Sequence, residues 1–161
     1  MQKTWSSIVN KNFNEAALNY NESAVIQKST ALQLAQICSH HPIQNGLWVD
    51  LGSGTGLLAK SLEDLHPNQS VLRLDNSKQM INQHSDKSTK QLWNLNDGLP
   101  KWSEKPNLLA SSFVLHWLDN PQEQLRQWFN SLSPDGCIAL AIPIKGSFPE
   151  WYEAAEKANL T

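Results

Sequence analysis

The stretch VDLGSGTGLLAKSL, residues 49–62, decides the fold of this chain of 161 residues. It begins with part of a short apolar run of the kind that forms a strand buried on both faces, and a glycine loop follows at once. Beyond the loop, the leucines recur at the spacing of one helix face. A strand, a tight glycine loop and a helix in this order usually hold a nucleotide-like ligand.

The alternation of strands and helices continues along the chain. Five apolar runs predict strands, at 47–51, 70–75, 91–95, 107–115 and 137–142. Helical patterns occur before, between and after them, at 22–38, 58–65, 77–81, 120–132 and 149–159. This alternation is typical of a parallel, doubly wound α/β sheet, whose ligands bind beyond the carboxyl ends of the strands. We expect one domain, 1–161, with an N-terminal helical segment over 1–45 and an α/β core over 46–161.

Local signals predict where several helices begin and which faces they bury. Ser77 is the expected N-cap of a short helix that carries Met80 and Ile81. Asn120 is expected to cap a longer helix that has Pro121 in its first position. The apolar faces of three helices are predicted to consist of Ala31, Leu34 and Cys38; of Leu58, Leu62 and Leu65; and of Leu125, Trp128, Phe129 and Leu132.

Composition excludes several classes of function. The formal net charge is -2 and the charges are interspersed, so no basic stripe is present for duplex nucleic acid. The opening segment lacks the apolar region of a secretory signal, and the apolar runs are too short to cross a bilayer. Cys38 and Cys137 show no metal-binding spacing and fit small buried residues in a reduced compartment. We therefore expect a cytoplasmic protein without a metal, and we interpret its seven tryptophans as packing or interface residues.

The spacing of the glycine loop bears on the type of ligand. The dinucleotide fingerprint places glycines first, third and sixth. Here Gly56 stands in the fifth place and Leu57 in the sixth, which weakens a dinucleotide interpretation.

Asp50 lies two residues before Gly52, where a carboxylate repels a pyrophosphate and attracts an ammonium or a sulfonium. At ~4 Å and an effective dielectric near 20, this interaction has a gross energy of roughly 4 kcal/mol, of either sign. As an alternative, Asp50 accepts hydrogen bonds from backbone N–H groups of the loop.

Asp75 is the second acidic candidate. It ends the second predicted strand, where a carboxylate can accept both hydroxyls of a ribose. NAD sites share this feature, so it indicates only a nucleoside, and Asp75 could instead cap the helix that begins at Ser77. An acid at each of the two positions around a compact glycine loop suits S-adenosylmethionine, which has a ribose, an ammonium and a sulfonium but no phosphate.

At this point the sequence resembles the class I S-adenosylmethionine-dependent methyltransferases over nearly its whole length. VDLGSGTG resembles their first motif, LRLDNSKQMI the second, WNLNDGLP the third, SSFVLHWLDNP the segment after strand four and LSPDGCIALAIP the fifth-strand motif. The resemblance implies a Rossmann-like, mostly parallel sheet of about five strands in the order 3-2-1-4-5, flanked by helices. It also implies that the chain is an enzyme that uses S-adenosyl-L-methionine.

The site residues follow from the residues and this resemblance together. The cofactor-binding candidates are Asp50, Gly52, Ser53, Gly54, Gly56, Asp75, Asn76, Asn94, Leu95 and Ser112. Asn94 and Leu95 are expected to contact the adenine, although Asn94 could also be a turn residue. Tyr20 is expected to close over the sulfonium and His116 to line the pocket after strand four, as candidate catalytic residues. Simple packing is the alternative for both aromatic side chains.

Within the class, the chain is most similar to the malonyl-[acyl-carrier protein] O-methyltransferases of biotin synthesis. The segments that suggest it are FNEAALNYNESAVIQKSTA (13–31), LHWLDNPQEQL (115–125) and GSFPEW (146–151). The likeness implies methylation of the free carboxylate of a malonyl thioester. Such a carboxylate is already nucleophilic, so a general base is not required. The alternatives are another small-molecule methyltransferase, an NAD-dependent oxidoreductase, or a cofactor-binding module without catalysis.

One departure from the class concerns the end of the sheet. The class normally adds a sixth and a seventh strand, whereas this chain ends at Thr161, soon after the fifth predicted strand. We therefore expect a sheet without the last two strands, whose fifth strand is an apolar edge open to self-association.

Overall fold

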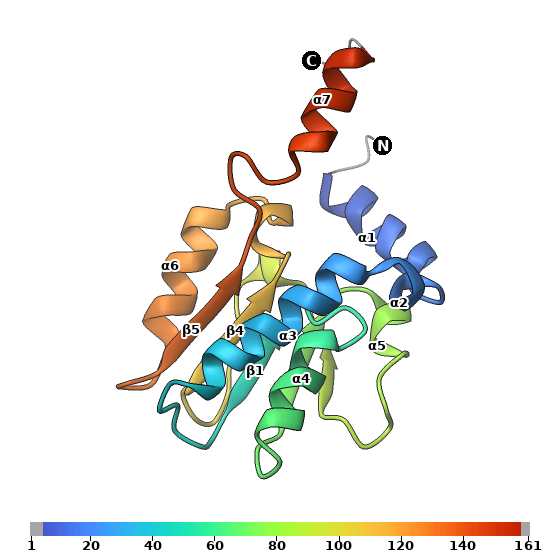
Figure 1. Cartoon of the computed structure of the whole chain (residues 1–161). Coiled ribbons are helices and arrows are strands. Elements are labelled where there is room, and N and C mark those ends of the chain that lie inside the picture. The colour runs from blue at the N-terminus through green and yellow to red at the C-terminus, as the bar shows by residue number, and fades with distance from the viewer. Residues whose placement is uncertain (1–4, 159–161) are drawn as a thin grey trace.

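The computed structural model describes residues 5–158 and contains a parallel sheet in the predicted order, β3-β2-β1-β4-β5 (Figure 1). The strands are β1 (Trp48–Leu51), β2 (Val71–Asp75), β3 (Lys90–Leu92), β4 (Leu108–Ser112) and β5 (Cys137–Ala141). Each neighbouring pair runs parallel, so all the strands end at the same edge of the sheet. The fold expected from the sequence is thereby confirmed.

The helices are α1 (Trp5–Ala16), α2 (Tyr20–Ser23), α3 (Val25–Ser39), α4 (Leu57–Leu65), α5 (Lys78–Ile81), α6 (Pro121–Ser131) and α7 (Pro149–Lys157). Most helices lie where helical patterns were found, but α1 lies in the expected N-terminal helical segment without such a pattern, and the helix expected over 22–38 is interrupted at Ala24. Two 3₁₀ turns, η1 (Leu95–Asp97) and η2 (Leu115–Trp117), follow the third and fourth strands. The last helix was predicted to reach residue 159, which lies outside the described residues. In the described part of the chain, no helix combines the length and the apolar character that crossing a membrane requires.

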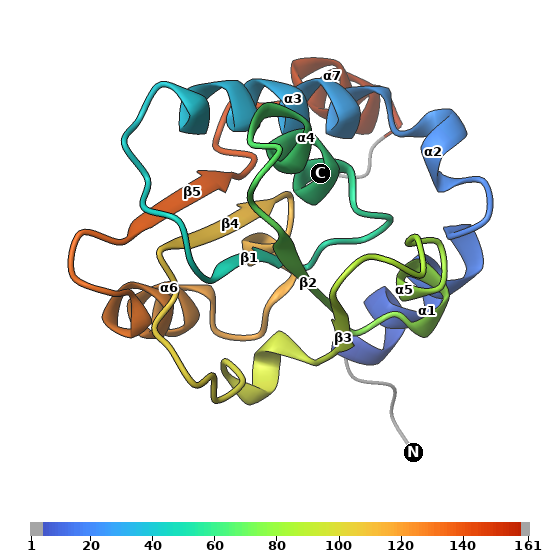
Figure 2. The same ribbon diagram turned by 90° about the horizontal axis from the view of Figure 1, so that it is seen from below.

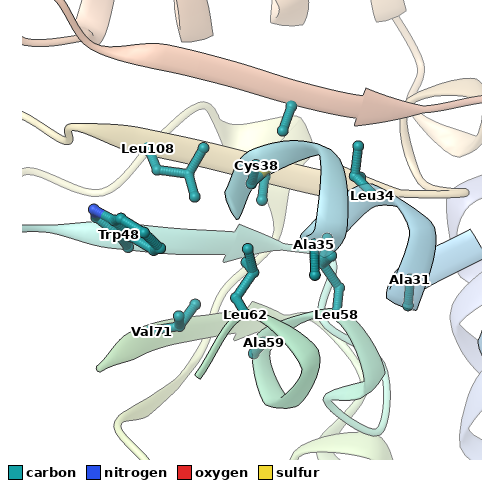
Figure 3. Packing of buried hydrophobic residues seen from close by; sticks show 12 residues of the cluster. Ala31, Leu34, Ala35, Cys38, Trp48, Leu58, Ala59, Leu62, Val71 and Leu108 are labelled. Atoms are coloured by element: carbon teal, nitrogen blue, oxygen red, sulfur yellow. The ribbon is translucent and has the colours of Figure 1, made fainter. Parts of the chain in front are cut away.

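Helices cover both faces of the sheet, with α3 and α4 on one side and α6 on the other (Figure 2). Because successive strand residues point to opposite faces, β1 divides its side chains between two cores. Trp48 packs with α3 and α4, whose buried face includes Leu34, Cys38 and Leu62 (Figure 3). Val49 and Leu51 pack on the other side with Trp128 of α6, among others. All four residues of β1 are buried, as expected for a central strand.

The predicted stripe of α3 is confirmed, because Ala31, Leu34 and Cys38 are all buried. The stripes of the other two helices need one correction each. Leu65 is exposed at the end of α4, and Phe129 of α6 is 69% exposed. In α6 the buried stripe runs through Gln124 and Trp128, and Phe129 follows Trp128 by one residue, about 100° further round the helix.

Of the two predicted N-caps, one is confirmed fully and the other only in its position. Ser77 caps α5 as predicted, since its hydroxyl accepts a hydrogen bond from Met80 N–H at 3.1 Å. Asn120 precedes α6 and Pro121 is its first residue, but the Asn120 side chain makes no capping hydrogen bond. The Asn120 carbonyl accepts from Gln124 N–H instead, so only the position of the cap was predicted correctly.

The third and fourth strands end earlier than predicted. β3 stops at Leu92, and the Asn94 side chain then accepts a hydrogen bond from Asn96 N–H to start the η1 turn. β4 stops at Ser112 because Phe113 adopts a left-handed backbone with φ of 57°. The apolar residues beyond these points, such as Leu95 and Leu115, lie in turns and pack in the same core as Val49, Leu51 and Trp128. The turns carry other side chains to the edge where the strands end.

Helix α1 is held beside the ends of β2 and α5 by polar side chains. Asn10 Nδ2 donates to Asn76 O at 2.8 Å, and Asn14 Oδ1 accepts from Ser77 Oγ at 2.8 Å. Further along, Thr55 Oγ1 of the glycine loop donates to Asn21 Oδ1 at 2.7 Å. The N-terminal helices are thereby fixed at the edge of the sheet where all five strands end.

Candidate functional site

Two adjoining pockets lie at the carboxyl ends of the strands, on either side of the glycine loop. The larger, of about 90 Å³, lies between α1, the end of β2 and the η1 and η2 turns. The smaller, of about 40 Å³, lies between the loop, α3 and the start of α4. Both are lined by Tyr20, Gly52, Gly54 and Ser112. The predicted site residues therefore meet at one place, with two exceptions given below.

The three glycines of the loop all have positive φ but serve different purposes. Gly52 has φ of 72°, and an added Cβ would lie 2.5 Å from Val114 Cγ2, so the backbone packs closely there. Gly54 has φ of 53° and no atom within 4 Å of an added Cβ, so its backbone faces open space in the cleft. Gly56 has φ of 89°, precedes α4 and packs against the His84 ring. Gly56 lines neither pocket and is the first exception.

Asp50 lies at the base of the smaller pocket and is only 1% exposed. Its Oδ2 accepts a hydrogen bond from Ala59 N–H, in the first turn of α4, at 3.0 Å. Burial raises the pKa of this carboxyl to about 7, against the lowering effects of the Ala59 N–H and of Arg73. Asp50 thus accepts its hydrogen bond from helix α4, and the alternative that it binds N–H groups of the loop is corrected accordingly. A carboxyl so placed readily gains a proton, and a cationic ligand favours its ionised form.

Asp75 ends β2 and lines the larger pocket together with Asn76. Its Oδ2 accepts from Gly54 N–H and its Oδ1 from Ser77 N–H, both at 2.8 Å. Burial raises the pKa of Asp75 above its ordinary value, although these N–H groups act in the opposite direction. The carboxylate thus joins the glycine loop to the start of α5. Each oxygen still has a lone pair with which to accept a further hydrogen bond.

Two serines show that the cleft has polar groups to offer a ligand. The hydroxyls of Ser53 and Ser112 are buried and make no hydrogen bond to another group in the described part of the chain. Both line the smaller pocket, near Asp50. Buried hydroxyls without a partner are uncommon, because leaving one unsatisfied costs roughly 1–3 kcal/mol. Their presence here suits a ligand that carries several polar atoms.

Asn94 and Leu95, which are expected to contact the adenine, lie on the wall of the larger pocket. Leu95 is buried and supplies an apolar surface there. The Asn94 side chain is the η1 cap already described, with its Oδ1 3.1 Å from Asn96 N. Asn94 is therefore a turn residue, as the alternative interpretation stated. Asn94 also lines the pocket, and the two roles are compatible.

Tyr20, which begins α2, lines both pockets and an open groove of about 810 Å³ beside them. Burial and the nearby Asp75 raise the pKa of its phenol, so it stays protonated at neutral pH. His116 lines only the groove and is the second exception. Burial lowers the pKa of His116, which leaves its ring neutral at pH 7. Tyr20 therefore lies at the junction of the cleft and the groove, and His116 lies beyond it.

Several residues that line the larger pocket were not predicted, and four of them are aromatic, namely Phe13, Trp93, Phe113 and Trp117. Trp117 stacks on Trp5 with ring centroids 5.8 Å apart and meets Phe13 edge-on at 6.0 Å. Trp117, Phe13 and Trp93 all line this pocket, so two of the tryptophans interpreted as packing or interface residues also border the cleft. The position of Trp117, just beyond the fourth strand, was a usable signal. Phe13 lies on a polar N-terminal helix whose path over the cleft the sequence does not disclose.

Among residues 5–158, no group of three or more His, Cys, Asp or Glu side chains is placed to hold a metal ion. The cleft instead combines an aromatic and apolar half with a polar half that contains a buried carboxyl. Its donor and acceptor groups suit a nucleoside joined to a cationic amino-acid group.

The comparisons with known proteins agree with this chemistry. The family described as "Methyltransferase domain" matches residues 49–138. A malonyl-[acyl-carrier protein] O-methyltransferase of Alcanivorax borkumensis is 27% identical over 99% of this chain and 56% of its own length. A trans-aconitate 2-methyltransferase of Mycobacterium tuberculosis is 30% identical over 68% of this chain and 41% of its own. The chain thus spans little more than half the length of the first of these curated relatives.

A solved structure of the plantazolicin methyltransferase BpumL, in complex with a pentazolic desmethylPZN analog and SAH, has a TM-score of 0.72 to this chain. It is 16% identical, and the alignment covers 93% of this chain and 60% of that one. At this identity the likeness concerns the fold.

Proposed function

The chain belongs to the methyltransferase domain family, and from this membership we propose that its cleft binds S-adenosylmethionine and that the chain transfers the methyl group to a carboxylate acceptor. One observation carries the proposal. The two pockets meet at Gly54, and each has its own acidic residue, Asp75 in the larger and Asp50 in the smaller. This division matches a ligand with a nucleoside at one end and an ammonium at the other.

The larger pocket is assigned to the nucleoside. Asp75 accepts hydrogen bonds from the ribose hydroxyls with the lone pairs that its two backbone N–H partners leave free. Asn76 lies next to it on the pocket wall. Leu95 and the Asn94 side chain border the adenine, and the aromatic residues of α1 and η2 cover it.

The smaller pocket is assigned to the amino-acid end of the cofactor. The ammonium pairs with Asp50, whose buried carboxyl ionises in response. The hydroxyls of Ser53 and Ser112, which have no partner in the described structure, donate to the carboxylate of the same group. The Gly54 backbone lies between the two halves, where an added Cβ would meet no atom within 4 Å, so the ligand can pass close to it.

S-adenosylmethionine supplies a methyl group on a sulfonium, which leaves as a neutral thioether. The acceptor carboxylate attacks this carbon in line, a C–O bond forms as the C–S bond breaks, and sulfur keeps the electron pair. A carboxylate needs no general base, so the protein contributes placement and exclusion of water. Well-oriented pairs can gain roughly 7–11 kcal/mol in this way. Tyr20, at the junction of the cleft and the groove, is placed to close over the sulfonium.

The groove beside the cleft is the proposed acceptor site, and we propose malonyl-[acyl-carrier protein] as the acceptor. Its lining is largely apolar and aromatic, with His116 among its polar residues. Two of the curated relatives are named for acceptors that are carboxylic acids, a malonyl thioester and trans-aconitate. A small-molecule carboxylate is therefore the second candidate acceptor.

Binding is tested by thermal shift with S-adenosylmethionine, S-adenosylhomocysteine and NAD. A ligand at a hundredfold excess over its Kd stabilises the protein by about 2.7 kcal/mol. We expect stabilisation by the first two ligands, and stabilisation by NAD alone would contradict the proposal. Asp75→Ala should weaken the binding of S-adenosylhomocysteine by at least about tenfold in calorimetry, whereas Asp97→Ala, at an exposed position in η1, should not.

Catalysis is tested by transfer of a labelled methyl group to malonyl-acyl-carrier protein and to trans-aconitate in parallel. Label on the acyl-carrier protein supports the first acceptor, and label only on the small acid supports the second. Cofactor binding with no transfer to either would support a binding module without catalysis.

A further inference from the structure

His84 follows α5 in the chain, yet its ring lies against the glycine loop, thirty residues earlier in the sequence. The residue is 7% exposed, and its Nε2 lies 2.8 Å from the Gly54 carbonyl oxygen. The Cε1 and Nδ1 side of the ring packs on Gly56, where an added Cβ would lie 2.9 Å from each of these atoms. The imidazole therefore touches two of the three loop glycines, and none of the roles assigned above uses it.

The partner of the ring fixes its tautomer. A carbonyl oxygen only accepts hydrogen bonds, so Nε2 must carry the hydrogen and donate it. Burial lowers the pKa of His84, which favours a neutral ring, and the hydrogen bond to Gly54 opposes this. The charged groups that face it are Arg73 on β2 and Lys90 on β3, which lower the pKa further, and Glu63 on α4, which raises it. The neutral ring with hydrogen on Nε2 is the form that fits this setting.

The main chain of Gly54 is held on both of its polar groups. Its N–H donates to Asp75 Oδ2 and its carbonyl accepts from His84 Nε2, both at 2.8 Å. Both side chains belong to the segment that runs from the end of β2 toward β3, and Lys90 anchors that segment by donating from Nζ to the His84 carbonyl at 3.1 Å. Gly54 lines both pockets, so these two hydrogen bonds set the orientation of the backbone between them.

We propose that His84 is a positioning residue that holds the Gly54 carbonyl, and with it the glycine loop, in the geometry that receives S-adenosylmethionine. The inference rests on the proposed function of the cleft and deepens it. It states that a side chain outside both pockets fixes the conformation of the glycine loop. Asp75 holds the same residue from its N–H side. Loss of the donor at position 84 therefore releases one of the two side-chain hydrogen bonds that hold the Gly54 main chain.

Two substitutions separate the hydrogen bond from simple packing. His84→Phe keeps a ring of similar shape but removes the donor, and His84→Gln keeps an N–H donor at a comparable distance along the side chain. We expect His84→Phe to raise the Kd for S-adenosylhomocysteine about three- to tenfold in calorimetry, with His84→Gln within about twofold of the unaltered chain. In the transfer assay His84→Phe should raise the KM for the methyl donor and leave kcat within about twofold, because His84 touches no reacting group.

Nitrogen-15 NMR of the histidine ring gives a readout that does not depend on any variant. The expected spectrum of the ligand-free chain shows Nε2 protonated and Nδ1 not. An Nδ1–H tautomer, with Nε2 unprotonated, would overturn the inference. The inference would also be wrong if His84→Phe bound S-adenosylhomocysteine as tightly as the unaltered chain, or if His84→Gln bound it as weakly as His84→Phe. If the unaltered chain itself bound no cofactor, the proposed function would fail, and the tautomer would still report on the His84–Gly54 hydrogen bond.

Discussion

Gly52 and Gly54 are the same amino acid in the same loop, yet different constraints require glycine at each. At Gly52 an added methyl group would overlap the Val114 side chain, so the constraint comes from packing inside the protein. At Gly54 the same methyl group would meet no atom and would project into the cleft. A substitution at Gly54 therefore tests the ligand site with little damage to the core.

We expect Gly54→Ala to weaken binding of S-adenosylhomocysteine at least about tenfold, because the methyl group takes space that the ligand needs. Gly146→Ala is the matched control, since Gly146 also has positive φ, meets nothing within 4 Å of an added Cβ and lines neither pocket. Each substitution should lower the free energy of unfolding by about 1–2 kcal/mol through backbone strain. Equal ligand affinity in the two variants, measured by calorimetry, would show that Gly54 does not face the ligand.

Asp50 gives the affinity for the cofactor a pH dependence. Its folded pKa is raised to about 7, and pairing with an ammonium favours the ionised form. Binding therefore releases a proton below that pH, and the affinity should rise, by up to about tenfold per unit, as pH increases toward about 7. In the ligand-free protein, raising the pH has the opposite effect on the free energy of unfolding. The native state holds the proton that the unfolded state has lost between about pH 4 and 7, so this carboxyl destabilises the fold as pH rises.

Calorimetry in two buffers of different ionisation enthalpy measures the proton released on binding. Asp50→Asn should bind the cofactor more weakly and abolish both the proton release and the pH dependence. A pH dependence that persists unchanged in Asp50→Asn would assign it to another group.

The sequence located the acidic residues of the site but not their surroundings. Asp50 and Asp75 could be placed at neighbouring strand ends, because parallel strands end at one edge of the sheet. That Asp50 is fully buried against α4, and that Asp75 binds the Gly54 N–H, depend on how the loop folds back. His84 gave no signal, since its distance from the loop along the chain hides the contact.

At the scale of elements, a buried arginine joins β2 to α4. Arg73 donates from Nη2 to Glu63 Oε2 at 2.6 Å and from Nη1 to Glu63 Oε1 at 3.0 Å, and its side chain is 5% exposed. Partial burial raises the pKa of Glu63, but the hydrogen bonds from Arg73 and from Val71 N–H outweigh it and lower the pKa overall. The pair therefore ties the first helix after the glycine loop to the strand that carries Asp75.

Glu63→Gln should lower the free energy of unfolding by about 1–2 kcal/mol, because it leaves a buried guanidinium without its counter-charge. Asp64→Asn is the matched control, since its pair with Lys60 is exposed and is worth about 0.5 kcal/mol or less. Urea unfolding of the three proteins gives these values. The lowered pKa of Glu63 adds stability that is present above its unfolded pKa and is lost as pH falls through its folded pKa. An acid transition unchanged in Glu63→Gln would contradict this role.

Elements were predicted well where periodicity or turn chemistry is strong and poorly where the chain leaves the sheet. The Ala31, Leu34 and Cys38 stripe of α3 is buried as expected. β3 and β4 stop early because the Asn94 turn and the left-handed Phe113 break the extended backbone, while the apolar residues that follow continue the appearance of a strand. The apolar pattern indicates which residues are buried but not which are in a strand, and these residues join the core from turns.

At the scale of the whole molecule, β5 is one of the two edge strands of the sheet in the described residues, and only β4 pairs with it. Four of its five residues are only partly buried, and Ile142 and Ile144, which follow it, are exposed. Figure 1 shows β5 at the outer side of the sheet, with α7 carried away from it by the segment that follows. An edge with unpaired backbone groups next to apolar side chains is a template for pairing between chains.

We therefore expect this 161-residue chain to self-associate through β5, with a mass that rises with concentration in light scattering coupled to gel filtration. A lysine next to the edge opposes such pairing, because approaching chains would have to bury its charge. Ile142→Lys should shift the equilibrium toward the monomer. Ile8→Lys on α1 is the matched control, because it also removes an exposed isoleucine but lies on a helix that packs against α5, beside β2 and β3. A chain that stays monomeric at high concentration, or an equal effect of the two substitutions, would show that the β5 edge does not pair.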